Sequence, residues 1–239
     1  MQRLVVAVAL GALAWCAPTQ DIVAQSAVPI AERVQSRELV VVVHGMGRTS
    51  RSMRPMALAL EEAGYDVVNI GYSSLCCTIA ELGAAVLREL ETQRQPRHEV
   101  VHFVSHSLGG IIVRWILTQG SKPAGIGRAV MLAPPNQGSR SADRYTPLIG
   151  WLLEPIDELR TDSTATVRTM PRVVGVPIGV ISGRQDGKLT YEDSHLDEAA
   201  AHVVVDGYHT FLMRRHEVHR LTIGFLRTGR FDPPMLATP

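Results

Sequence analysis

The sequence predicts an α/β fold, in which helices cover both faces of a mainly parallel sheet of about six strands. Short runs rich in valine, isoleucine and leucine recur along the chain, as expected for strands that are buried on both faces. Segments with helical spacing of apolar residues separate most of these runs, and glycine-containing turns follow several of them. Such an alternation implies parallel strands joined by right-handed crossovers.

The composition fits a globular protein and excludes several other classes. The chain has 239 residues, of which 46% are hydrophobic, with 24 Lys+Arg against 23 Asp+Glu. A chain of this length buries roughly 70% of its unfolded surface, so its core needs neither a disulfide nor a metal. The net charge of +1 gives no basic surface for phosphate neutralisation. We therefore expect no nucleic-acid partner.

The N-terminal segment has the pattern of a secretory signal peptide. Arg3 precedes an apolar run over 4–15, and small residues at Ala24 and Ser26 suit a cleavage site. A membrane anchor is the weaker alternative, because a spanning helix needs about 20 apolar residues. We expect a signal peptide over 1–26 and a periplasmic or secreted protein, in which 27–239 form a single domain.

The expected strands are the short apolar runs. They cover 39–43, 65–70, 100–104, 129–132, 176–182 and 202–205.

Helix signals lie between these runs. Ser52 is expected to cap the first helix, which Gly64 ends. Thr78 and Glu81 form a capping box at the start of the second helix. Further helices are expected over 110–119 and, before Gly229, over 214–226.

An insertion is expected near 139–172, where the periodicity weakens. Its apolar cluster at 148–153 is compatible with a short lid over an acyl pocket and equally with core packing. Cys76 and Cys77 are expected to be two small apolar residues in a loop, because adjacent cysteines close a disulfide only in a strained ring.

Four polar side chains follow expected strands. His44, Ser107, Asp186 and His209 each come shortly after an apolar run. The carboxyl ends of parallel strands share one edge of the sheet, so these side chains should converge there.

Ser107 is the candidate nucleophile. It is the central residue of Ser105-His106-Ser107-Leu108-Gly109, between an expected strand and an expected helix. A sharp turn at this point exposes the hydroxyl and requires small residues two positions away on either side. The simpler interpretation is that Ser107 only caps the helix that follows.

His209 is the candidate base, because it follows the last expected strand. In active sites with a nucleophilic serine on such a strand-to-helix turn, the catalytic residues follow the chain order serine, acid, histidine. His216 and His219 fall on the terminal helix and are expected to be solvated, whereas His195 and His202 come before or at the start of the last strand.

Asp186 is the candidate acid, because it follows the fifth expected strand in a glycine-containing turn. Asp206 is the main competitor, but it lies on the same strand as the histidine that it would have to orient. Asp157 and Asp162 fall in the insertion and suit turn or cap roles.

Two backbone N–H groups are candidates for an oxyanion hole. Leu108 follows Ser107 at the start of a helix, where the helix dipole favours negative charge. Met46 lies in the turn after the first strand, where Gly45 allows the backbone to approach a substrate closely.

These motifs resemble those of α/β-hydrolases, in particular the bacterial lipases and esterases that lack the first two antiparallel strands of larger members. The resemblance runs from about 39 to 231, with Ser105 where a glycine is usual. It implies Ser107 as nucleophile, Asp186 as acid and His209 as base, and no cofactor or metal. The segments that carry it are VVVHGMGR, FVSHSLGG, LAPPNQGS, DGKLTYEDS and YHTFLMR.

The expected activity is hydrolysis of carboxylic esters with apolar or lipidic acyl chains through an acyl-enzyme intermediate. The same residues would serve a thioesterase, an amidase or an acyltransferase. A hydrolase-fold binding protein without activity is the remaining alternative. For a lipid ester we also expect transient contact with a lipid surface.

Overall fold

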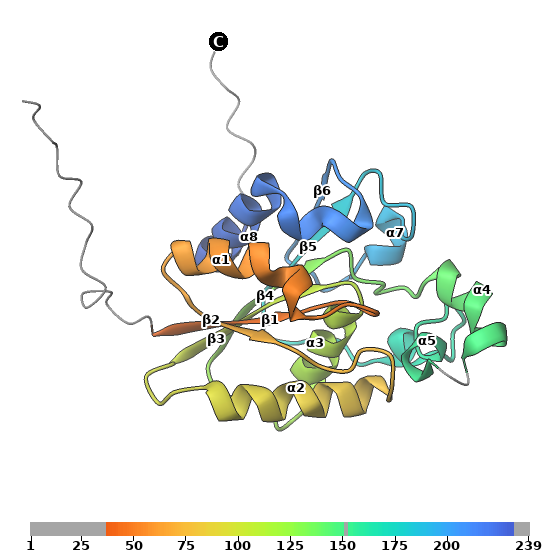
Figure 1. The fold of residues 1–239 in the computed structure, drawn as a ribbon, viewed down its shortest axis with the longest axis horizontal. Helices are drawn as coiled ribbons and strands as arrows, with labels where there is room; N and C mark the ends of the chain where they lie inside the picture. Colours follow the sequence, from red (N-terminus) through yellow and green to blue (C-terminus); the bar gives the residue numbers. More distant parts are fainter. Residues whose placement is uncertain (1–36, 151–152, 232–239) are drawn as a thin grey trace, which may run out of the picture. The chain divides into compact units, whose positions relative to one another are not determined.

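The computed structural model describes residues 37–150 and 153–231, and the expected signal peptide lies outside them. Six strands form one sheet in which every neighbouring pair is parallel, in the order β2-β1-β3-β4-β5-β6. The predicted parallel sheet is therefore confirmed (Figure 1). The strands are β1 (Glu38–Val43), β2 (Asp66–Ile70), β3 (Val100–His106), β4 (Ile126–Leu132), β5 (Ile178–Gly183) and β6 (Ala201–Val205).

Helices cover both faces of the sheet. Helices α1 and α8 lie on one face and α2 and α3 on the other (Figure 1). In β1, Val40 and Val42 pack into the core on the α1 side, while Val41 and Val43 pack into the core on the α2 side. After Glu38 every residue of the strand is apolar and buried, because both faces of the sheet are covered. The main helices are α1 (Arg54–Glu62), α2 (Ile79–Gln93), α3 (Leu108–Thr118) and α8 (His216–Thr228).

The helix ends confirm some of the expected signals and correct another. Thr78 and Glu81 form the capping box of α2, and Gly229 ends α8 in a left-handed conformation with φ 76°. Ser52 does not cap α1. It lies inside a short 3₁₀ helix, η2 (Ser50–Met53), and its hydroxyl donates to the Thr49 carbonyl.

The insertion contains three short helices, α4 (Arg140–Ile149), α5 (Glu154–Asp157) and α6 (Thr166–Thr169). Leu148 is 68% exposed, whereas Leu153 packs against the core. Arg114 of α3 is buried and donates to the carbonyls of Asn136, Val167 and Met170. This side chain therefore ties the insertion to the main body of the protein.

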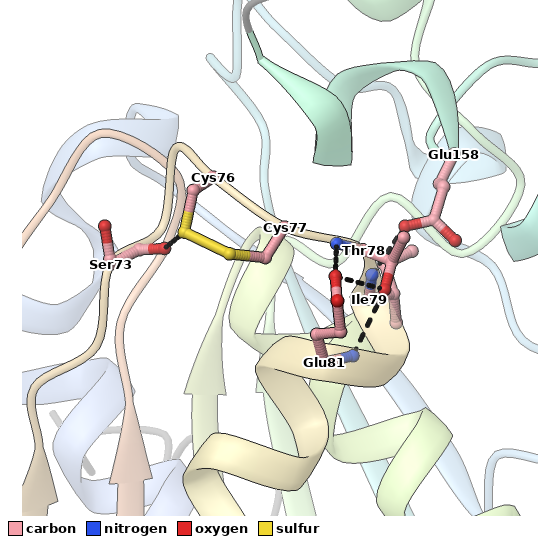
Figure 2. The surroundings of a disulfide bond; sticks show 7 residues. All are labelled: Ser73, Cys76, Cys77, Thr78, Ile79, Glu81 and Glu158. Atoms are coloured by element: carbon pink, nitrogen blue, oxygen red, sulfur yellow. Dashed lines mark hydrogen bonds between the residues drawn. A yellow bond between two sulfur atoms is a disulfide. The ribbon is translucent and has the colours of Figure 1, made fainter.

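Cys76 and Cys77 form a disulfide in the loop between β2 and α2, so the expectation of two unpaired cysteines is wrong (Figure 2). The chain turns at Cys77 with φ 73°, a left-handed conformation that residues other than glycine rarely adopt. No glycine at this position predicts the turn from the sequence. The Sγ of Cys76 lies 3.4 Å from the Ser73 carbonyl oxygen.

The other short elements are α7 (Tyr191–Ser194) and the 3₁₀ helix η3 (His209–Arg214). Across 37–150 and 153–231, none of the helices combines the length and the apolar character that crossing a membrane requires.

Candidate active site

The strand register brings the candidate residues to one edge of the sheet. Val43 at the end of β1 pairs with Ser105 near the end of β3, and β2 lies on the other side of β1. The order of the chain reverses between β1 and β3, which is where ligands bind in open parallel sheets. The turns after these two strands, which carry Met46 and Ser107, therefore lie side by side.

Ser107 occupies a one-residue turn between β3 and α3. Its backbone has φ 53° and ψ −125°, a conformation that non-glycine residues rarely adopt, and its side chain makes no capping bond to α3. The interpretation of Ser107 as a simple helix cap is therefore wrong. A Cβ at Gly109 would lie 2.5 Å from the His44 carbonyl oxygen, so the second position after the serine must be glycine.

His209 lies between Ser107 and Asp186. Its Nδ1 is 2.7 Å from Oδ2 of Asp186, and its Nε2 is 3.1 Å from Oγ of Ser107. A carboxylate only accepts, so Nδ1–H donates to Asp186 and leaves the Nε2 lone pair to accept the serine proton. The side chains of His209 and Asp186 are only 8% and 2% exposed.

Asp186 stays ionised because its hydrogen bonds outweigh the cost of burial. Burial raises the pKa of this carboxyl. The hydrogen bond and charge of His209 and the N–H groups of Lys188 and Leu189 lower the pKa by more than burial raises it, so the net pKa lies below its ordinary value. The two N–H groups bind Oδ1 at 2.8 and 3.0 Å, so both carboxylate oxygens have donors.

The competing acids lie elsewhere. Asp206 is 66% exposed and accepts from Nε of Arg184 at 3.0 Å. Asp157 and Asp162 both pair with Arg160 in the insertion.

The other C-terminal histidines have partners of their own. His202 contacts the Ser182 hydroxyl and His195 contacts Asp197. His216 is exposed as expected, but the expectation for His219 is wrong. His219 is buried, and its Nε2–H donates to the Met213 carbonyl, because this face of α8 packs onto η3.

The N–H groups of Met46 and Leu108 flank Ser107. Within the described part of the chain, neither of them has a hydrogen-bond acceptor. Met46 lines the same cavity as Ser107, and Leu108 is the first residue of α3, where the helix dipole favours an anion. Both N–H groups are therefore free of acceptors among the described residues.

Two side chains that the sequence reasoning did not select hold the turn around Met46. The Tyr72 hydroxyl donates to the His44 carbonyl at 2.6 Å, and its ring stacks on the His44 imidazole at 4.2 Å. The Ser74 hydroxyl accepts from the Gly47 N–H at 3.0 Å. Their only signal in the sequence is a position just after β2, the strand next to β1.

A cavity of about 120 Å³ opens beside Ser107 and His209. The insertion supplies much of its wall through Ala142, Ile156 and Leu159. A larger groove of about 910 Å³ lies between α1 and α8, but none of the converging side chains lines it.

No protein-family profile matches this chain, and no curated protein matches it in sequence. Solved structures do match. The mature form of Bacillus licheniformis lipase BlEst2 is 18% identical with a TM-score of 0.63, over 80% of this chain and 91% of that one. The propeptide form of the same lipase matches over 81% of this chain and half of its own length, with 18% identity and a TM-score of 0.64.

Two further structures extend the likeness to other sources. The Pyrococcus furiosus esterase Pf2001 is 20% identical with a TM-score of 0.56, over 80% of this chain and 83% of that one. The metagenomic carboxyl esterase MGS0156 is 14% identical with a TM-score of 0.63, over 75% of this chain and 66% of that one. With the parallel sheet and the turn at Ser107, these similarities show that the chain has the α/β-hydrolase fold.

Proposed function

We propose that this protein is a serine hydrolase that cleaves carboxylic esters. The observation that carries the proposal is the continuous contact from Asp186 through His209 to Ser107, at 2.7 and 3.1 Å, on a serine held in a strained turn. This is the arrangement that turns a weakly nucleophilic hydroxyl into an effective nucleophile.

In the proposed reaction Oγ of Ser107 attacks the acyl carbonyl while Nε2 of His209 takes its proton. Asp186 keeps the imidazole in the required tautomer and stabilises the imidazolium. The N–H groups of Met46 and Leu108 stabilise the oxyanion, and each is worth about 10²- to 10³-fold in rate. His209 then protonates the departing alcohol, and a water molecule activated by the same imidazole releases the acid.

The wall of the cavity favours a short apolar acyl group. Ala142, Ile156 and Leu159 present carbon atoms to it, and about 120 Å³ is well below the roughly 300–1,000 Å³ of pockets for drug-sized ligands. The names lipase, esterase and carboxyl esterase of the structural neighbours agree with ester chemistry.

The test is hydrolysis of p-nitrophenyl esters of increasing acyl length by the purified protein. We expect turnover that is highest for short chains and is lost in Ser107→Ala, with Ser52→Ala as a matched control on η2. Equal turnover by Ser107→Ala and the wild type would contradict the proposal.

A periplasmic or secreted location is part of the proposal. The leader-like pattern of 1–26 supports it, and so does the Cys76–Cys77 disulfide, because disulfides persist in oxidising compartments.

Two exposed apolar side chains lie beside the candidate site. Leu75 beside Gly47 is 43% exposed, and Phe211, two residues after His209, is 49% exposed. They support transient contact of this edge of the sheet with lipid. Co-sedimentation with lipid vesicles, reduced by Phe211→Ser, is the expected result.

A further inference from the structure

His106 lies directly before Ser107 and is almost completely buried, with 2% of its surface exposed. Its ring centroid is 4.9 Å from that of His209, and its Nε2 is 2.9 Å from the backbone carbonyl oxygen of His209. A carbonyl oxygen can only accept, so Nε2 of His106 must carry the proton. The imidazole therefore donates to the main chain of the residue that would serve as the base.

The other ring nitrogen faces the opposite side of the site. Within the described residues, Nδ1 of His106 has no hydrogen-bond partner. A Cβ on Gly45 would lie 2.9 Å from this nitrogen, so the turn that carries Met46 packs directly on the ring. Burial and the neighbouring His209 lower the pKa of His106 to about 3, which keeps the ring neutral at neutral pH.

The contact joins two parts of the site that come from distant strands. His209 begins η3 after β6, whereas Ser107 follows β3, and β4 and β5 lie between these strands in the sheet. The distance of 3.1 Å between Oγ of Ser107 and Nε2 of His209 must therefore be maintained across the sheet edge. The His106 contact is a direct hydrogen bond from β3 to the backbone of the His209 loop.

We propose that His106 is a positioning residue: its Nε2–H fixes the backbone of His209 so that the His209 imidazole stays aligned with Ser107. The inference rests on the proposed hydrolase function. It assigns no contact with substrate to His106, which acts only through His209.

The test compares two substitutions of similar length. A methionine side chain has no N–H to donate, so His106→Met removes the hydrogen bond. His106→Gln places an amide N–H the same number of bonds from Cβ and retains it. We expect His106→Met to lower kcat on a p-nitrophenyl ester by about 10- to 100-fold with KM within about twofold, because small displacements of a catalytic group cost this much. His106→Gln should recover most of the loss.

A readout without substrate separates positioning from general destabilisation. The Nδ1–H of His209, bonded to Asp186, should give a downfield proton NMR signal in the resting wild type that weakens or broadens in His106→Met and returns in His106→Gln. The control is His98→Met. It removes a buried imidazole that lies just before β3, away from the site, and is bonded to Asp66 at the start of β2. We expect it to lower the melting temperature but to leave kcat and the NMR signal unchanged.

Either of two results would overturn the inference. One is wild-type kcat and an unchanged NMR signal in His106→Met, and the other is an equal loss in the Met and Gln variants, which would make ring packing the cause. The NMR arm needs no turnover, so it still tests His106 if esters are not the substrate. Failure of the hydrolase proposal is recognised separately, by a wild type that turns over no ester.

Discussion

Asp186 and Asp206 follow neighbouring strands, yet their surroundings give the two carboxylates different chemistry. The Asp186 side chain is 2% exposed and accepts from His209 and two backbone N–H groups. Asp206 is 66% exposed and pairs with Arg184 at the surface, where an ion pair contributes little. Burial and a fixed donor set therefore suit Asp186 for orienting an imidazole.

Asp186→Asn should lower kcat by about 10⁴-fold, because an amide no longer holds the imidazole in the required tautomer. Steady-state hydrolysis of a chromogenic ester measures the change. Asp206→Asn is the matched control and should keep nearly full activity. The prediction is wrong if the two variants have the same kcat.

Among the elements, the loop between β2 and α2 has the closest connection to the proposed oxyanion hole. Tyr72 and Ser74 bond the turn after β1, and the Cys76–Cys77 disulfide and the Thr78 cap close the other end of the loop (Figure 2). Glu158 of the insertion also accepts from the Ile79 N–H, so the loop is held at both ends.

Ser74→Ala removes the acceptor of the Gly47 N–H and should loosen the turn that presents Met46. We expect kcat to fall by less than the roughly 10²- to 10³-fold that losing a donor costs, with KM nearly unchanged. Ser73→Ala, at the exposed neighbouring position, is the control. A wild-type kcat for Ser74→Ala would show that this bond does not support the turn.

Thr78→Ala removes the N-cap of α2, whose hydroxyl accepts from the Glu81 N–H. The free energy of unfolding should fall by about 1 kcal/mol. Urea denaturation measures it, and activity at low denaturant should fall less than in Ser74→Ala, because the Tyr72 and Ser74 bonds still hold the end of the loop beside Met46. Thr92→Ala at the other end of the helix should change stability by less than about 0.5 kcal/mol. Equal effects of the two variants would rule out the cap as the cause.

At the scale of the whole molecule, several histidines are held neutral by the fold. Burial is the main cause that lowers the pKa of His44, His102 and His106, and it lowers that of His202 to about 4. At a pH below the ordinary histidine pKa of about 6.5, these imidazoles take up protons in the unfolded chain but not in the folded one. The free energy of unfolding must therefore decrease as the pH falls below that value.

The melting temperature should accordingly drop between pH 7.5 and pH 5, and calorimetry over this range measures the drop. His106 alone contributes up to about 1.4 kcal/mol per pH unit where its unfolded form is protonated and its folded form is not. The lowered pKa of Asp186 acts in the same direction, but only in more acidic solution, below its ordinary pKa of about 3.8. A melting temperature that stays constant or rises on acidification would contradict this account.

The sheet was predictable because its strands are buried on both faces and therefore read as continuous apolar runs such as Leu39–Val43. Parallel topology then placed Ser107, Asp186 and His209 at one edge without any knowledge of the loops. The burial of His219 and the roles of His106 and Ser74 could not be predicted in this way. They depend on contacts between segments whose relative position only the folded loops determine.

In the proposed active site, one sheet edge gathers a hydroxyl, an imidazole, a carboxylate and two free N–H groups around a single point. A crystal structure of the protein after reaction with a fluorophosphonate tests it most directly. We predict phosphorus bonded to Oγ of Ser107 and its oxygen within hydrogen-bonding distance of the N–H groups of Met46 and Leu108. An unlabelled Ser107, or a phosphoryl oxygen directed away from both N–H groups, would contradict it.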